Sequence, residues 1–358
     1  MKVVLSGYYG FHNVGDEAIL FSIIQALKKA NQHVQITVLS NDPDYTKNTY
    51  EVDAVNRWKL KEVSAAIKQA DGLISGGGSL LQDKTGNRSV IYYSAIMLIA
   101  KFHRKPFVVY AQGIGPVDKE YNQKITKFTL SKAALISVRD EASKKFLQQI
   151  GIKNEIIEVP DPVLGIESQD GYANEWLEKT GLTEKKYISV SVRDWPSEIK
   201  YLEMIAKALN GVSEHQIVFV PMHGEHDEKT SFKVAEMMDK KSYIAPYEFS
   251  IADKIAVIGG SQLLVGMRLH ALIFAAVMDT PFTALSYDPK IDAFAKLAKQ
   301  PVAAHVNEAN WTEETVLEVI KQQLNNLPKY TDNVKKYADQ AKLESQNTAI
   351  LALQSFKK

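Results

Sequence analysis

The stretch VVLSGYYGFHNVGDEAIL, residues 3–20, indicates the fold of this chain. A short β-branched strand over 3–6 runs into a glycine-rich loop, and a helix follows from Asp16 with Ile19 and Ile23 on one apolar face. A strand that passes through a glycine turn into an amphipathic helix is the first half of a βαβ unit. We therefore expect parallel strands joined by helices, which is an α/β fold.

The same alternation continues along the chain and restarts once. Further strands are predicted at 34–40, 72–75, 107–111, 135–138 and 156–159 and, beyond a polar stretch at 167–175, at 187–193, 216–220, 262–265 and 281–286. This pattern predicts two tandem doubly wound, Rossmann-like domains that face a shared cleft, where such folds bind ligands. We expect an N-terminal domain over 1–165, a second α/β domain over 166–310, and C-terminal helices over 311–358. The pattern leaves open whether these helices cross back to the first domain.

Composition and charge exclude several classes of protein. The 358 residues suffice for about two domains, and the 45% of apolar and 24% of charged side chains are typical of globular proteins. A net charge of +1 argues against a nucleic-acid binder that relies on a general basic field, so any anion site must be local. The absence of cysteine excludes disulfides, thiolate metal sites and a cysteine nucleophile.

We expect the protein to be cytoplasmic. A chain without cysteine fits a reducing compartment, and the N-terminus predicts a strand rather than a signal peptide. The most apolar later stretches, 90–100 and 269–278, are about half as long as the ~20 residues that span a bilayer. We therefore expect them to be buried helices.

The first glycine loop, 7–17, predicts a site for a neutral, hydroxylated ligand. It does not match the GxGxxG pattern of dinucleotide-binding folds, and the Gly-Lys-Ser/Thr triplet of a P-loop does not occur in the sequence. Asp16 and Glu17 at the start of the helix would repel a phosphate. We therefore expect Gly10, Asn13 and Asp16 to contact a sugar. The alternative, that the glycines only form a tight turn and Asp16 only caps the helix, stays open.

A second glycine loop, SGGGSLLQD at 75–83, follows the strand at 72–75. Three successive glycines at the end of a strand indicate that the backbone passes close to another group. A flexible linker is disfavoured because two leucines follow at once. We expect Gly77 and Gly78 to approach a ligand or a neighbouring domain.

The stretch VGMRLHA, 265–271, carries the clearest chemical signal. Gly266 turns the chain after a strand, and Arg268 and His270 are expected in the first turn of a very apolar helix. A helix N-terminus and a guanidinium group both favour an anion, and His270 suits general acid or base catalysis. Lys290 follows the next strand and is expected to converge on the same anion, although alone it is typical of a solvated lysine.

The four letters SVRD occur at 137–140 and at 191–194 and place Arg139 and Arg193 just beyond predicted strands. Each arginine is a candidate for ligand binding. For Arg139 the alternative is an ion pair with Asp140, which is expected to cap the following helix.

The segment HGEHD, 223–227, offers two imidazoles and two carboxylates in one loop. Its HxxH spacing does not match the HExxH motif of zinc enzymes on one helix, so we expect no metal. A polar pocket wall with His223 nearest the strand end is favoured. Whether His223 and His226 contact a ligand stays open.

Taken together, the motifs are similar to those of a known family. GYYGFHNVGDEAIL, ISGGGSLLQD, AQGIGP, SVRDEAS, VPDP and GMRLHALIFA followed by SYDPK run along nearly the whole chain. On these motifs the sequence resembles the polysaccharide pyruvyltransferases, specifically the CsaB-type enzymes that pyruvylate secondary cell-wall polymers of Gram-positive bacteria.

The resemblance implies a fold similar to glycosyltransferase type B, with phosphoenolpyruvate as the donor and a pair of glycan hydroxyls as the acceptor. Transfer would form a cyclic pyruvate ketal and release phosphate, without a metal or another cofactor. By the family pattern, Arg139, Arg268, His270 and Lys290 would be the donor-site and catalytic residues. The acceptor would be a wall-polymer precursor on a membrane lipid, which leaves peripheral contact with the inner face of the membrane open.

We assign the remaining candidates to two sites. The donor side would include Gly266, and the acceptor side would include Gly10, Asn13, Asp16, Gly77, Gly78, Arg193 and His223. Two rival functions stay open: a nucleotide-sugar glycosyltransferase of the same fold, and a protein that binds glycans or anions without catalysis. An oxidoreductase is disfavoured because neither domain carries the dinucleotide fingerprint.

Overall fold

The computed structural model describes residues 1–84, 86, 88–167, 175–182 and 186–357. The chain divides into two compact units: unit 1 comprises Met1–Ile166 and Ala341–Lys358, and unit 2 comprises Glu167–Gln340. The C-terminal segment predicted over 311–358 is not a part of its own, because the division falls within it at Gln340. Most of the polar stretch predicted at 167–175 lies outside the described residues.

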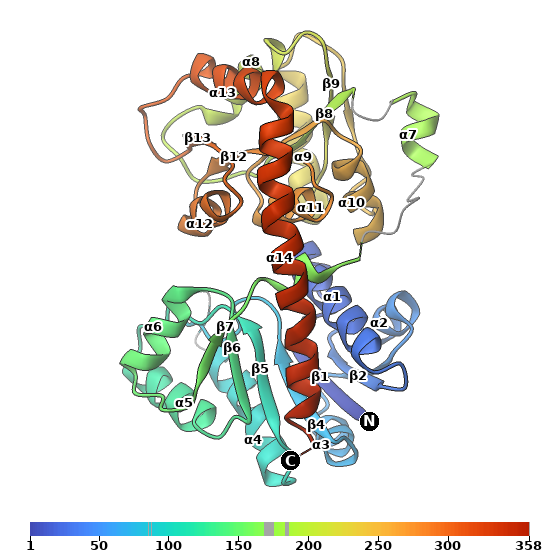
Figure 1. Ribbon diagram of the computed structural model, residues 1–358, viewed down its shortest axis with the longest axis vertical. Helices are drawn as coiled ribbons and strands as arrows, with labels where there is room; N and C mark the ends of the chain where they lie inside the picture. Colours follow the sequence, from blue (N-terminus) through green and yellow to red (C-terminus); the bar gives the residue numbers. More distant parts are fainter. Residues whose placement is uncertain (85, 87, 168–174, 183–185, 358) are drawn as a thin grey trace. The chain divides into compact units, whose positions relative to one another are not determined.

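Unit 1 is built on a seven-stranded parallel sheet with the order β3-β2-β1-β4-β5-β6-β7 (Figure 1). Its strands are β1 (Lys2–Tyr9), β2 (Gln35–Ser40), β3 (Asp53–Asn56), β4 (Gly72–Gly76), β5 (Phe107–Gln112), β6 (Leu135–Val138) and β7 (Ile156–Glu158). Every residue of β4 and β5 is buried. Such continuous burial is expected of parallel strands that helices cover on both faces.

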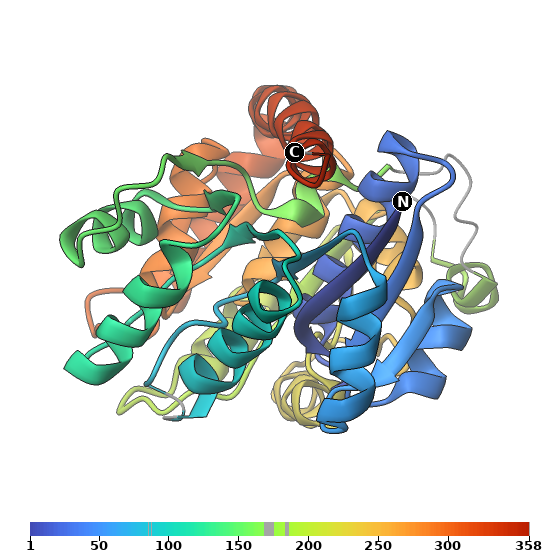
Figure 2. The same cartoon turned by 90° about the horizontal axis from the view of Figure 1, so that it is seen from below.

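Helices lie on both sides of this sheet (Figure 2). The strand order changes direction between β1 and β4, and right-handed crossovers then place the helices before and after this point on opposite faces. The helices are α1 (Val14–Ala30) and α2 (Pro43–Tyr50) on one face, and α3 (Leu60–Gln69), α4 (Arg88–Phe102), α5 (Glu120–Leu130) and α6 (Glu141–Gln149) on the other, where they bury one core cluster against the strands.

A short 3₁₀ helix (Pro162–Gly165) ends the first part of unit 1, and the last helix of the chain completes the unit. This helix, α14 (Leu327–Gln354), is continuous across the division at Gln340. Its C-terminal part contacts unit 1, where Ser345 Oγ donates to the carbonyl of Pro162 at 3.2 Å. Beyond the helix, the Phe356 ring lies against Gly72, which has no side chain to displace it.

Unit 2 repeats the architecture with a six-stranded parallel sheet in the order β10-β9-β8-β11-β12-β13. Its strands are β8 (Tyr187–Ser191), β9 (Gln216–Phe219), β10 (Ser242–Ile244), β11 (Leu263–Gly266), β12 (Phe282–Ser286) and β13 (Val302–His305). Its helices are α7 (Glu175–Thr180), α8 (Tyr201–Asn210), α9 (Gly224–Glu236), α10 (Ile251–Gly259), α11 (Leu269–Val277), α12 (Pro289–Leu297), α13 (Glu313–Asn325) and the first part of α14. The predicted α/β class with two doubly wound sheets is therefore confirmed.

Three strands escaped the sequence prediction, and all three lie at sheet edges. They are β3, β10 and β13, each of three or four residues. Their sequences DAVN, SYI and VAAH lack a run of β-branched residues. These strands form because each pairs with a longer neighbour, as β10 pairs with β9, and not because of their local propensity.

Both sheets have a switch point, where the strand order reverses and where open α/β sheets bind ligands. In unit 1 it lies between β1 and β4, and in unit 2 between β8 and β11. The two glycine loops follow β1 and β4, and the VGMRLHA stretch follows β11. The described part of the chain has no helix that combines the length and the apolar character needed to cross a bilayer.

Candidate functional site

Two arginines emerge side by side at the switch point of unit 2. Ser191 of β8 pairs with Gly266 of β11, and the Met267 amide donates to the Ser191 carbonyl at 2.7 Å. Arg193 and Arg268 each follow two residues beyond this pair. The strand predicted at 187–193 ends at Ser191, so Arg193 belongs to the loop at the carboxyl edge.

Arg268 is held by a buried carboxylate. Its Nε and Nη2 donate to the two carboxylate oxygens of Asp227, at 2.9 and 2.5 Å. Asp227 belongs to α9, and its side chain is completely buried. The Met222 amide also donates to Asp227, at 3.3 Å. A bidentate pair of this kind fixes the plane of the guanidinium group. No residue that the structure describes engages Arg268 Nη1, which leaves that nitrogen for a ligand.

Arg268 is not in the first turn of α11, as the sequence predicted, but is its N-cap residue with extended backbone. Its side chain makes no capping bond, so the helix N-terminus keeps amide donors for an anion. His270 lies in the first turn, half-buried. Packing explains the glycine at position 266, because a Cβ there would lie 2.7 Å from Leu272 Cδ2.

Arg193 lies against two aromatic rings that also contact each other. Its Cζ is 4.8 Å from the Trp195 ring and 4.6 Å from the Tyr287 ring, and its Nη1 donates to the Tyr287 hydroxyl at 2.8 Å. Lys290 is the second residue of α12, and Asp288 caps this helix by accepting from the Lys290 amide. The Lys290 side chain is exposed, and the structure does not bring it into an ion pair with a described residue.

His223 lies on the same side as the arginines. Burial and then the charge of Arg268 lower the pKa of His223, against the raising influence of Asp227. The His226 Nδ1 is 3.7 Å from Asp227 Oδ1, but its side chain is largely exposed. Among the described residues, no three His, Asp or Glu side chains gather as metal ligands.

In unit 1 the first glycine loop is held by its own polar residues. Asn13 caps α1, and its Oδ1 accepts from the amides of Gly15 and Asp16 at 3.0 and 3.3 Å. Glu17 is buried and accepts from the Gly10 amide at 2.8 Å. Gly10 has φ +73°, and a Cβ there would meet the β2–α2 turn. Asn13, and not Asp16, is therefore the capping residue.

Asp16 lies partly buried beside the second glycine loop. Burial raises the pKa of Asp16 to about 7, against the lowering influence of the Arg139 charge. Gly78 has φ +55°, and a Cβ there would lie 2.6 Å from Asp16 Oδ1. Gly77 has φ +97°, and a Cβ there would lie 3.0 Å from the Tyr9 hydroxyl. No hydrogen bond or ion pair from a described residue occupies the Asp16 carboxyl group.

Arg139 has a partner that the sequence did not predict. Its Nη1 donates to Asp161 Oδ2 at 2.9 Å, and its Nη2 donates to Ser79 Oγ at 3.3 Å. The alternative ion pair with Asp140 is wrong, although Asp140 does cap α6, as predicted, by accepting from the Ser143 amide. Asp161 belongs to the VPDP segment, and this family motif was the sequence signal that could have pointed to it.

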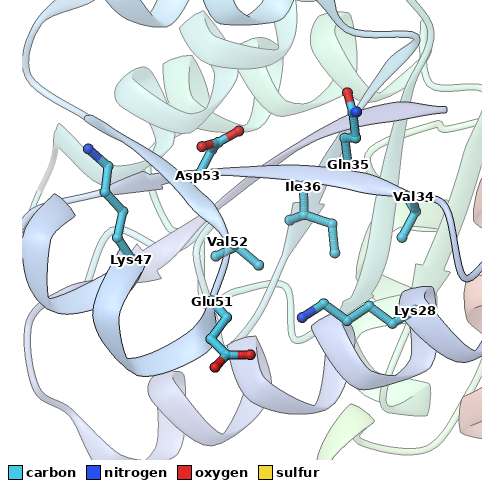
Figure 3. A pocket seen from close by; sticks show the side chains of 8 residues that line it. All are labelled: Lys28, Val34, Gln35, Ile36, Lys47, Glu51, Val52 and Asp53. Carbon is cyan, nitrogen blue, oxygen red and sulfur yellow. The ribbon is translucent and has the colours of Figure 1, made fainter.

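A pocket of about 520 Å³ lies elsewhere in unit 1 (Figure 3). Gln35 and Asp53, the first residues of β2 and β3, place it at the amino ends of the strands. Its other lining residues are Lys28, Val34, Ile36, Lys47, Glu51 and Val52. None of the candidate residues lines this pocket, so it is separate from both switch points.

A sequence model of the polysaccharide pyruvyl transferase family matches residues 13–289. The chain belongs to this family. The matched range includes Arg139, Arg268 and His270, whereas Lys290 lies just beyond it. Membership makes the chain a transferase whose general activity is pyruvyl transfer to a polysaccharide, and it confirms the family resemblance expected from the motifs.

A curated relative matches the chain at low identity. The amylovoran biosynthesis protein AmsJ of Erwinia amylovora is 22% identical over 353 residues, which cover 81% of this chain and 84% of AmsJ.

Solved structures share the fold of this chain. HepE of Anabaena, in complex with UDP-glucose, has a TM-score of 0.66 at 12% identity and covers 100% of this chain and 99% of its own. The UDP-GlcNAc 2-epimerase of Neisseria meningitidis, bound to UDP-GlcNAc, has a TM-score of 0.66 at 13% identity, with 100% of both chains covered. Heptosyltransferase II of Escherichia coli has a TM-score of 0.58 at 13% identity and covers 92% of this chain and 100% of its own. The fold is thus similar to glycosyltransferase type B.

Proposed function

We propose that the protein transfers the pyruvyl group of phosphoenolpyruvate to a sugar of a cell-wall polysaccharide precursor, forming a cyclic ketal and releasing phosphate. The observation that carries the proposal is a group of hydrogen-bond donors and cations at the switch point of unit 2. There Arg193 and Arg268 emerge beside the uncapped N-terminus of α11, which carries His270. In a chain of net charge +1, this local concentration of donors suits a small, highly charged donor.

Phosphoenolpyruvate carries a carboxylate and a phosphate on three carbons. We assign these anionic groups to Arg268 and to the amides of α11, with Lys290 as a further cation. The placement of Arg193 and His223 beside Arg268 favours the donor side for both, rather than the acceptor side expected from the sequence. The lowered pKa of His223 keeps this imidazole neutral near pH 7, as a hydrogen-bonding group beside the arginines.

We assign the two proton transfers to two residues. One acceptor hydroxyl attacks C2 and passes its proton to Asp16, while C3 receives a proton from His270. Phosphate then leaves through an oxocarbenium-like state, and the second hydroxyl passes its proton to the departing phosphate as it closes the ketal. Asp16 suits the base role because its carboxyl group has a pKa of about 7 and is not engaged by a described residue.

Arg139 keeps its proposed role in catalysis. Its ion pair with Asp161 orients the guanidinium group, and its charge acts on Asp16. We expect Arg139→Ala to lower kcat more than it weakens equilibrium binding of phosphoenolpyruvate, whereas Lys290→Ala weakens donor binding directly. Calorimetric titration of each variant with phosphoenolpyruvate, alongside steady-state rates, separates the two effects. Equal losses of rate and binding in Arg139→Ala would instead assign Arg139 to the donor pocket.

We further propose that the acceptor is carried by a membrane lipid and that the reaction takes place in the cytoplasm, at the inner face of the membrane. The test incubates the purified protein with phosphoenolpyruvate and synthetic glycan acceptors. Phosphate release matched by an acid-labile mass gain on the glycan supports the proposal. Turnover that requires a nucleotide sugar would indicate a glycosyltransferase, and glycan binding without any turnover would indicate a non-catalytic protein.

A further inference from the structure

A cluster of aromatic side chains surrounds one buried arginine at the carboxyl edge of the unit 1 sheet. Arg57, which follows β3, is only 3% exposed. Its Cζ lies 4.5 Å from the ring of Tyr92 in α4, 5.1 Å from that of Trp58 and 5.2 Å from that of Phe11. Tyr8, near the end of β1, stacks on Phe11 at 4.0 Å with an interplanar angle of 5°. Three segments far apart in the sequence thus build one cluster.

Two rings of the cluster face solvent and yet are held in place. Trp58 is 59% exposed and Tyr8 is 40% exposed. The Trp58 indole nitrogen donates to Asn41 Oδ1 at 2.9 Å, and Asn41 in turn donates to the carbonyl of Gly10. An exposed aromatic ring that contributes little to a core has no packing reason to be fixed in this way. Rings with an apolar face and a fixed orientation are typical of recognition surfaces.

Arg57 connects this cluster to the first glycine loop. Its Nη1 donates to the carbonyl of Gly7 at 2.8 Å, and its Nη2 donates to the Tyr93 hydroxyl at 3.2 Å. Its buried Nε has no hydrogen-bond partner among the described residues. Burying a guanidinium group with an unsatisfied donor is costly, so packing alone does not account for an arginine at this position. Tyr93 also lies within electrostatic reach of Asp16, which links the cluster to the proposed acceptor base.

We propose that Trp58 and Tyr8 form a subsite that stacks a sugar ring of the acceptor glycan, adjacent to the sugar that receives pyruvate. The proposal rests on the proposed function and extends it from one sugar to its neighbour in the chain. A pyranose ring presents C–H groups on its faces and hydroxyls around its rim. The aromatic faces can pack against the C–H groups, and the polar atoms of the neighbouring loops can form hydrogen bonds with the hydroxyls.

The carboxylates of the same loop support a neutral occupant. Asp16 and Glu17 lie in the first turn of α1, which follows this loop, and when ionised they disfavour a phosphate or an acidic peptide there. A neutral sugar has no such charge near its ring. Leu60, which is 57% exposed two residues beyond Trp58, makes a lipid surface the main rival occupant. The experiment therefore includes a vesicle arm.

The binding probe is chosen from mono-, di- and tetrasaccharides of glucose, galactose, mannose and their N-acetylamino forms. The best-binding sugar series is titrated, without donor, into the wild type and into Trp58→Ala, Trp58→Phe and Tyr8→Ala. Phe102→Ala is the matched control, because Phe102 is an aromatic residue of unit 1 that is 83% exposed at the far end of α4. Melting temperatures show that each variant is folded.

We expect Trp58→Ala to weaken binding of the tetrasaccharide about tenfold, with a smaller loss for the monosaccharide. Trp58→Phe, which keeps an aromatic face, should recover much of the affinity, and Tyr8→Ala should show a partial loss. With phosphoenolpyruvate present, the KM of the tetrasaccharide should rise in parallel, while the KM of phosphoenolpyruvate stays constant. Phe102→Ala should match the wild type throughout.

Several outcomes would overturn the subsite. Glycan affinity could be unchanged in folded Trp58→Ala, could fall equally in Phe102→Ala, or could be absent in the wild type for every sugar series. Alternatively, Trp58→Ala could lose binding to phosphatidylglycerol vesicles while its glycan affinity stays intact. The last would assign the cluster to a membrane. Glycan binding that depends on Trp58 without pyruvyl transfer would retain the subsite and contradict the proposed function, so the two can fail separately.

Discussion

Replacing Asp16 by asparagine should stabilise the protein at neutral pH and abolish its activity. Burial raises the pKa of Asp16 from 3.8 to about 7 in the folded chain. The folded state therefore holds a proton that the unfolded state releases between these two pH values. By linkage, this group's contribution to stability is complete below pH 3.8 and is lost as the pH rises to about 7. Asparagine does not ionise, so the variant does not lose this stability as the pH rises.

The size of the effect follows from the shift. A change from 3.8 to about 7 is roughly three pKa units, or about 4 kcal/mol at about 1.4 kcal/mol per unit. Asp16 is partly exposed, and water at its exposed edge screens part of this cost, so we expect about 1–3 kcal/mol. For a unit of this size, the melting temperature of Asp16→Asn should rise on the order of 5 °C at pH 8. The gain should vanish near pH 4.

The assay combines melting curves from pH 4 to pH 9 with kcat over the same range. In the wild type, kcat should rise as the pH increases through about 7, because the proposed base must be ionised. Asp118→Asn, which removes an exposed carboxylate, is the control and should leave both profiles unchanged. A lower melting temperature of Asp16→Asn at every pH, or an acid limb of kcat that survives in this variant, would refute the reasoning.

Three further predictions concern the two switch points. His270→Ala should lower kcat about 10²- to 10⁴-fold at an unchanged melting temperature, and a near-normal rate would exclude His270 as the acid. Asp227→Asn should destabilise the protein by about 3–5 kcal/mol in urea unfolding and raise the KM of phosphoenolpyruvate, because it leaves Arg268 without its counter-charge; a normal KM would show that Arg268 is oriented by other contacts. Gly77→Ala should lower the stability by about 1–3 kcal/mol, since φ is +97° and a Cβ would lie 3.0 Å from the Tyr9 hydroxyl; an unchanged melting curve would contradict this geometry.

Local sequence patterns predicted most of the fold. The alternation of apolar strands with amphipathic helices sufficed for the α/β class and for the central strands of both sheets. It failed at β3, β10 and β13, because edge strands of three or four residues depend on a neighbour rather than on their own composition. The two SVRD segments looked equivalent, yet Arg139 follows β6 while Arg193 follows β8 at the switch point.

The candidate site was predictable by residue type but not by partner. Arg268 and Asp227 are 41 positions apart, and Arg139 and Asp161 are 22 apart, so only the folded chain shows that each arginine has a buried or nearly buried carboxylate. The role of Asp16 depended on its surroundings as well. Its raised pKa comes from burial against a loop whose path requires Gly78, and a pattern of letters does not encode that contact.

The division of α14 between the units has a consequence for biosynthesis. Residues up to Ile166 are translated before unit 2, but the segment that contacts Pro162 and covers Gly72 is translated after it. Unit 1 therefore has to wait, with part of its sheet uncovered, until unit 2 has been made. A fragment that ends at Ile166 should be prone to aggregate, whereas adding Ala341–Lys358 as a separate peptide should restore its solubility. Unit 1 is thus begun before unit 2 and completed after it.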